Sequence, residues 1–129
     1  MIRRLGAAAG LALFLCACRG EPAHRGPDVV VEHRVQRGDA GAGAKLIRHY
    51  GCGSCHTIPG IRAAAGLVGP PLIHWSRRGV IAGQLPNTAA DLVRWIQNPQ
   101  SVEPGTAMPN LGVSEAQARD IAAYLYTLR

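Results

Sequence analysis

Two cysteines and a histidine form the stretch of this chain that is best suited to chemistry. Cys52 and Cys55 stand three positions apart, and His56 follows directly. This spacing is the pattern for covalent attachment of a c-type haem, in which both thiols form thioethers along one porphyrin edge. The histidine then lies under the iron as its proximal ligand. The motif therefore predicts a covalently bound haem c held by Cys52, Cys55 and His56.

Other uses of two thiols at this spacing fit the sequence less well. A redox-active dithiol needs no adjacent histidine. A zinc site needs two further ligands at a recognisable spacing, and the sequence offers none. With Cys16 and Cys18 assigned to the export signal described next, no cysteine remains for a disulfide.

The start of the chain predicts export and a membrane anchor. Arg3 and Arg4 precede an apolar run, residues 5–15, which is too short to span a bilayer but has the length of a secretory signal core. Leu15-Cys16-Ala17-Cys18 resembles the lipobox of bacterial lipoproteins, which implies a signal peptide over residues 1–17 and a lipidated Cys18. Several acyl chains on one terminus would hold the protein stably on the periplasmic side of a membrane. The alternative is a soluble periplasmic protein.

Residues 18–37 then predict the lipidated N-terminus and a flexible linker, because glycines, prolines and charges break any regular pattern there. Residues 38–129 predict one small all-α domain of short helices, whose core is marginal unless a haem completes it. N-terminal caps are expected at Asp39, at Asn87 or Thr88, and at Ser114. Gly43 lies on the apolar face of the first helix, where it permits close approach of another helix.

From Gly38 to Arg129 the chain resembles the class I cytochromes c, small electron carriers with helices packed around one covalent haem. The resemblance is carried by residues 52–56, 69–72, 104–109 and 120–125. It implies that the Pro70 carbonyl accepts a hydrogen bond from the proximal histidine, which orients the imidazole. It also implies that Arg78, with Arg77 as the alternative, holds a haem propionate.

Met108 is the candidate distal ligand of the iron. Apart from Met1 it is the only methionine, and the loop around it, with Pro104, Gly105 and Pro109, can carry a thioether to the iron. His74 is the rival sixth ligand. Trp95 stands where many relatives have a tyrosine near the methionine sulfur, which implies aromatic packing there.

These features predict a membrane-tethered, mono-haem electron carrier and not an enzyme. Residues 50–52, 57–60 and 68–71 resemble the cytochrome modules associated with haem-copper terminal oxidases. The resemblance implies redox protein partners, namely a terminal oxidase and a quinol-oxidising complex, and no small-molecule substrate. The residues expected to touch partners at the haem edge are uncharged: Ile58, residues 63–65 and Val68.

The alternatives are a haem enzyme or gas-binding sensor with an open iron position, and a structural subunit whose haem only stabilises the fold. The formal net charge is +6, and removal of Arg3 and Arg4 with the signal peptide leaves 6 − 2 = +4, a modest basic excess that suits an acidic partner or an anionic membrane. The arginines are scattered and no basic helix or aromatic platform accompanies them, so nucleic-acid binding is not expected.

Overall fold

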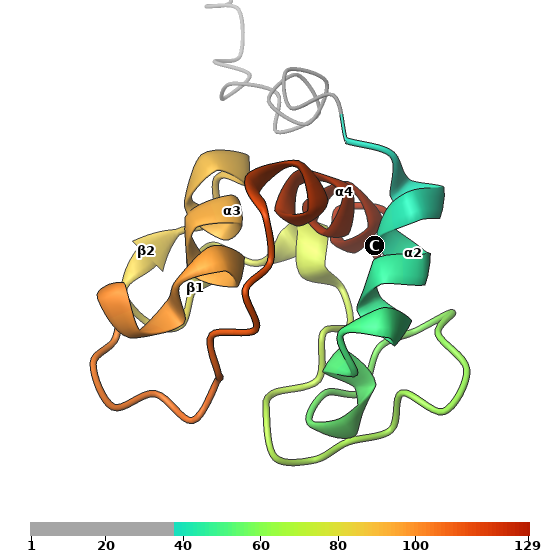
Figure 1. Cartoon of the computed structure of the whole chain (residues 1–129), viewed down its shortest axis with the longest axis horizontal. Helices are drawn as coiled ribbons and strands as arrows, with labels where there is room; N and C mark the ends of the chain where they lie inside the picture. The colour runs from blue at the N-terminus through green and yellow to red at the C-terminus, as the bar shows by residue number, and fades with distance from the viewer. Residues whose placement is uncertain (1–37) are drawn as a thin grey trace, which may run out of the picture.

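The computed structural model describes residues 38–129, and the predicted signal peptide, Cys18 and linker lie outside these residues. The described chain forms three α-helices and short 3₁₀ turns, arranged as Figure 1 shows. The helices are α2 (Ala40–His49), α3 (Ala89–Gln97) and α4 (Glu115–Leu125), and the 3₁₀ turns are η1 (Cys52–Ser54), η2 (Trp75–Arg77) and η3 (Pro99–Ser101). The predicted all-α class is confirmed.

The sequence did not predict a small β-hairpin that the described chain contains. Strand β1 (Val80–Ile81) pairs antiparallel with β2 (Leu85–Pro86), so that Val80 lies opposite Pro86 and Ile81 opposite Leu85. Two residues per strand are too few to produce the alternating pattern by which strands are recognised. The hairpin contributes the buried Ile81 to the core.

Each α-helix begins at a polar side chain that satisfies exposed backbone N–H groups. The Asp39 carboxylate accepts two of them, at 2.7 and 3.1 Å, at the start of α2. At α3 the cap is Thr88 and not Asn87, because the Thr88 hydroxyl accepts the N–H of the third helical residue at 3.1 Å. Ser114 and Gln117 form a reciprocal capping box at α4. The local signals for helix starts are therefore confirmed.

Helices α2 and α4 cross in direct backbone contact (Figure 1). A Cβ atom added to Gly43 would fall on the backbone carbonyl of Asp120, so only glycine allows this approach. The Asp120 carboxylate also accepts the backbone N–H of Asp39 at 2.8 Å, which fixes the start of α2 on α4. The close approach predicted at Gly43 is confirmed.

The hydrophobic core is at the same time the wall of a cavity. Ile47 from α2, Leu92 and Ile96 from α3, and Ile121 and Leu125 from α4 are all at least nine-tenths buried, and all five line the cavity. The three helices therefore enclose a space that their own side chains do not fill. A domain of this size buries too little apolar surface to be comfortably stable by itself, and a group that fills the cavity would complete the core.

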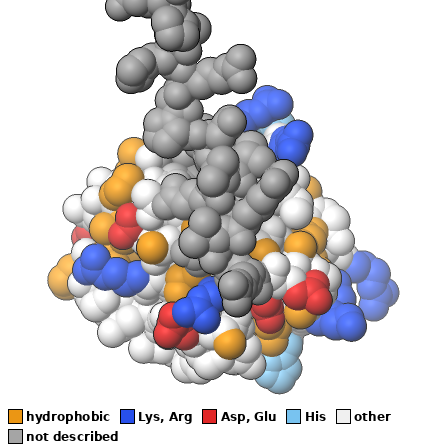
Figure 2. Space-filling view, turned by 90° about the horizontal axis from the view of Figure 1, so that it is seen from above, with side chains coloured by type: hydrophobic (Ala, Val, Ile, Leu, Met, Phe, Trp, Pro, Cys, Tyr) orange, Lys and Arg blue, Asp and Glu red, His pale blue; other side chains and the backbone are white. Residues whose placement is uncertain are grey.

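The end of the domain where the described chain begins carries charges of both signs. Figure 2 looks onto this end and shows basic and acidic side chains interspersed, with apolar side chains scattered singly. The ion pair between Arg119 and Glu115 lies on α4, beside Gly38, whose backbone packs on that of Arg119. Among residues 38–129, no helix has both the length and the apolar character to cross a bilayer.

Candidate functional site

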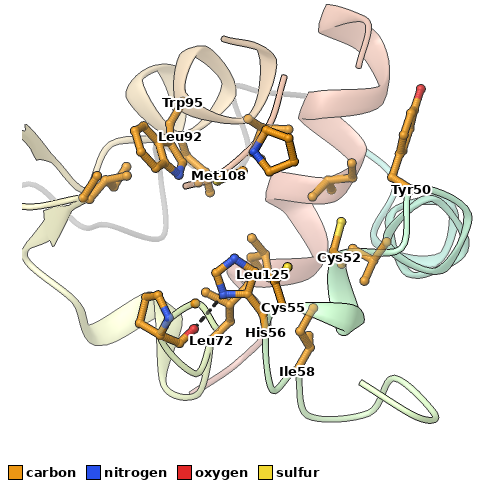
Figure 3. A pocket seen from close by; sticks show the side chains of 18 of the residues that line it. Tyr50, Cys52, Cys55, His56, Ile58, Leu72, Leu92, Trp95, Met108 and Leu125 are labelled. Carbon is orange, nitrogen blue, oxygen red and sulfur yellow. Dashed lines mark hydrogen bonds between the residues drawn. The ribbon is translucent and has the colours of Figure 1, made fainter. Parts of the chain in front are cut away.

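A cavity of about 400 Å³ lies between two walls of the domain and is lined mainly by apolar side chains. One wall carries Cys52, Cys55 and His56, and the opposite wall carries Met108 and Trp95 (Figure 3). Pro70 and Arg78 also line the cavity, so it brings together all six residues of the described chain that the sequence assigned to the site. The two alternatives, His74 and Arg77, do not line it.

The two thiols are positioned by a tight turn that follows α2. Gly51 adopts a φ of 68°, a left-handed conformation that favours glycine, and directs the chain into the 3₁₀ turn η1. The turn is closed by a hydrogen bond from the His56 backbone N–H to the Cys52 carbonyl, at 3.0 Å. Burial raises the pKa of the Cys52 thiol above its ordinary value. Cys52 and Cys55 are partly buried, and both line the cavity.

The His56 imidazole is fixed by a hydrogen bond to the backbone. Its Nδ1 lies 2.7 Å from the Pro70 carbonyl oxygen, and because a carbonyl only accepts, Nδ1 carries the proton. In the neutral imidazole the other ring nitrogen, Nε2, then keeps its electron pair, and Figure 3 shows it on the cavity side, facing the wall of Met108. A metal bound at Nε2 requires this tautomer.

Gly69 holds the Pro70 carbonyl against the imidazole. Its backbone N–H donates to the Cys55 carbonyl at 2.8 Å, and a Cβ at this position would lie only 2.6 Å from Nδ1 of His56. In the sequence Gly69 is recognisable only as part of the motif of residues 69–72. Its role in holding the His56 imidazole depends on a contact between residues thirteen positions apart, which the local sequence pattern around Gly69 does not reveal.

Hydrogen-bond donors gather at the end of the cavity near Arg78. The Arg78 guanidinium donates to the Pro71 carbonyl and, at 3.4 Å, to that of Ile73, and it lies 5.2 Å from the ring centre of Trp75. Trp75 also lines the cavity, and its buried Nε1 has no hydrogen-bond partner within the described residues. Arg77 is exposed and lies off the cavity. This end of the cavity is therefore suited to carboxylates.

The mouth of the cavity is bordered by apolar side chains. Val68, Val80 and Leu111 are 76%, 54% and 41% exposed, yet all three line the cavity. The expectation that Ile58 and the middle of residues 63–65 are surface contacts was wrong. Ile58 is 2% exposed and Ala64 8%, because both pack into the core and Ile58 forms part of the cavity wall.

The residues present fit a covalently attached haem. The cavity offers two thiols on one turn, an imidazole of the right tautomer, a thioether on the opposite wall and apolar lining between them. Within residues 38–129 no cluster of three or more histidine, cysteine, aspartate or glutamate side chains could hold a bare metal ion, so the zinc alternative gains no support.

The family model for cytochrome c matches residues 40–129, and the chain therefore belongs to the cytochrome c family. The family binds haem c covalently and transfers electrons. The chain is similar to cytochrome c oxidase subunit 2 of Alkalihalophilus pseudofirmus, with 35% identity over 91 residues. The match covers 70% of this chain and 26% of that protein, so the chain corresponds to about a quarter of its relative. No solved structure matches the chain.

We predict that Gly69→Ala disturbs the histidine wall. The added methyl group displaces either the imidazole or the Pro70 carbonyl, and overpacking of this kind costs about 1–3 kcal/mol of stability. The haem-loaded variant should unfold at lower urea concentration than the parent, and the pH dependence of its optical spectrum should change. Gly79→Ala is the control, since a Cβ there meets nothing within 4 Å. Equal behaviour of the two variants would contradict the role assigned to Gly69.

Proposed function

We propose that this chain binds one haem c through Cys52 and Cys55, and that His56 and Met108 would be the ligands of its iron. The observation that carries the proposal is the arrangement of the cavity, whose facing walls bear an imidazole held through Nδ1 by the Pro70 carbonyl and a thioether. Pro70 holds the imidazole in place, and Arg78 holds a propionate. When bound, the haem supplies a one-electron change between ferric and ferrous iron.

The side chains around the haem set how readily it accepts an electron. A thioether ligand favours ferrous iron and raises the potential above that of a bis-histidine site. The apolar lining from α3 and α4 excludes water, which also disfavours the more highly charged ferric state. The protein therefore acts as an acceptor and donor of single electrons and not as a binder of small molecules.

The alternative, a haem enzyme or gas sensor with an open iron position, has less support. Met108 lines the wall opposite His56, where an open position would lie. The other histidines among residues 38–129, His49 and His74, do not line the cavity. That wall therefore lacks an imidazole that could act as an acid or base on an iron-bound molecule.

We propose a haem-copper terminal oxidase as the electron acceptor, and a quinol-oxidising complex as the ultimate donor. Two observations support this proposal. One is the likeness to an oxidase subunit. The other is the apolar rim, defined as Val68, Val80 and Leu111 at the mouth of the cavity, where an uncharged surface lets a partner approach the haem closely. The chain could serve such an oxidase as a bound subunit or as a carrier.

We also propose that the protein is attached to a membrane through lipid on Cys18, on the periplasmic side, with residues 18–37 as the linker. The position of Gly38 supports this arrangement, because it lies at the start of α2 and the haem-binding turn follows the other end. Ten helical residues separate these ends by about 15 Å. A soluble periplasmic protein is the alternative.

We predict that Met108→Ala retains covalent haem but loses the sulfur ligand. The ferric variant should lack the weak far-red absorption band of sulfur-bound iron. Its potential should fall by on the order of 0.1 V, a fraction of the roughly 0.8 V that axial ligands span. The reduced variant should bind carbon monoxide rapidly at neutral pH. Leu111→Ala, in the same loop, is the control and should keep the band.

The parent protein provides the decisive comparison for this prediction. It should show no rapid spectral change with carbon monoxide, and such a change would favour the open-iron alternative. A Met108→Ala spectrum and potential identical to those of the parent would refute the ligand assignment.

We predict that Cys18→Ala releases a haem-containing protein from membranes, because the lipid acceptor is removed while the cytochrome domain is untouched. Fractionation of cells and detection of covalent haem in the soluble and membrane fractions measure this. Retention of the variant on membranes after a salt wash would refute the lipid anchor.

We predict that a purified haem-copper oxidase reoxidises the reduced protein, and that Val68→Asp slows this reaction several-fold. The new charge must be desolvated when the apolar rim meets a partner. Ala90→Asp is the matched control, because Ala90 is exposed on α3 and does not line the cavity. Stopped-flow spectroscopy of the haem gives both rates. Failure of the parent to be oxidised would refute the proposed acceptor.

A further inference from the structure

The methionine loop, defined here as residues 104–113, is joined to the rest of the domain by very few hydrogen bonds. Its internal bonds are short-range, from the Met108 N–H to the Thr106 hydroxyl at 3.3 Å and from the Gly112 N–H to the Asn110 side chain at 2.9 Å. A further bond joins the Thr106 N–H to the adjacent Glu103 carbonyl at 3.1 Å.

Apart from the bond to the adjacent Glu103, a single hydrogen bond connects this loop to the rest of the described chain. The side-chain amide of Gln100 donates from Nε2 to the backbone carbonyl oxygen of Met108, at 2.7 Å. The contact is therefore made at the very residue that carries the thioether. The remaining attachment of the loop is packing, chiefly by the buried Val113 at its end.

Gln100 lies on a turn that is fixed by burial and by backbone hydrogen bonds. It lies in η3, whose first residue, Pro99, is among the fully buried side chains. The backbone N–H groups of Val102 and Glu103 both donate to the Pro99 carbonyl, at 3.1 and 2.9 Å, and the Ser101 hydroxyl donates to the Asn98 carbonyl at 2.8 Å. A side chain on this turn can fix a loop that has few contacts of its own.

We propose that Gln100 is a positioning residue that holds Met108 at the iron. The inference rests on the proposed function, in which Met108 is a ligand, and adds the group that restrains it. The hydrogen bond between Gln100 and Met108 is exposed, and the net free energy of such a bond is small. It therefore shifts the equilibrium between bound and detached methionine only modestly. Its loss should raise the equilibrium fraction of protein with methionine detached by about three- to tenfold.

The test compares variants of the complete haem-loaded protein. Gln100→Glu keeps the size of the side chain but removes the N–H donors, and Gln100→Leu removes them without adding charge. In both, the far-red band of the ferric protein should be lost at lower imidazole concentration than in the parent, by about three- to tenfold. Gln97→Glu is the matched control, since it makes the same change on α3, off the cavity that holds Met108.

The outcomes separate this inference from the proposed function. A parent protein that lacks the far-red band would refute ligation by Met108 itself. A parent that has the band, together with Gln100 variants that titrate with imidazole as the parent does, would refute the role of Gln100 alone. An equal shift in Gln97→Glu and Gln100→Glu, with none in Gln100→Leu, would assign the effect to charge and also overturn the proposal.

Discussion

The backbone contact between α2 and α4 at Gly43 is the constraint on which the rest of the domain depends. Because no side chain separates the helices there, α4 can present Ile121 and Leu125 to the cavity while α2 delivers the chain to the thiols. The Asp120 carboxylate reinforces the contact by accepting the N–H of Asp39. A crossing even slightly wider would enlarge the cavity and leave its apolar walls without a close fit to a flat occupant.

The two walls of the cavity are held in different ways. The wall of His56 is stabilised by several bonds between segments, among them those of Pro70 to the imidazole and of Gly69 to the Cys55 carbonyl. On the opposite wall Met108 lies in a loop, and within the described chain the Gln100 side chain donates the one hydrogen bond that reaches this loop from η3. This difference matches the proposed chemistry, since thioether bonds secure one side of the haem permanently and a methionine ligand depends on the protein to keep it in place.

The sequence predicted those features that depend on local chemistry or on a well-known motif. The caps at Asp39 and Ser114 are local, because each bonds to backbone within its own first turn. The burial of Ile58 was missed, since an isoleucine near an expected haem edge reads equally well as core or surface until the loop is folded. Gln100 could not be found at all, because an exposed glutamine carries no pattern and acts through a contact with the next loop.

The place where the described chain begins has a consequence for how partners share this domain. Gly38 lies beside Arg119, at one end of α2, whereas the thiol-bearing turn and its open cavity follow the other end. The proposed attachment at Gly38 therefore lies at the far end of α2 from the thiols and leaves the cavity unobstructed. If electron donor and acceptor both dock at the apolar side chains of Val68, Val80 and Leu111, as proposed, they occupy this surface in alternation, and the rate of turnover depends on how quickly each one dissociates.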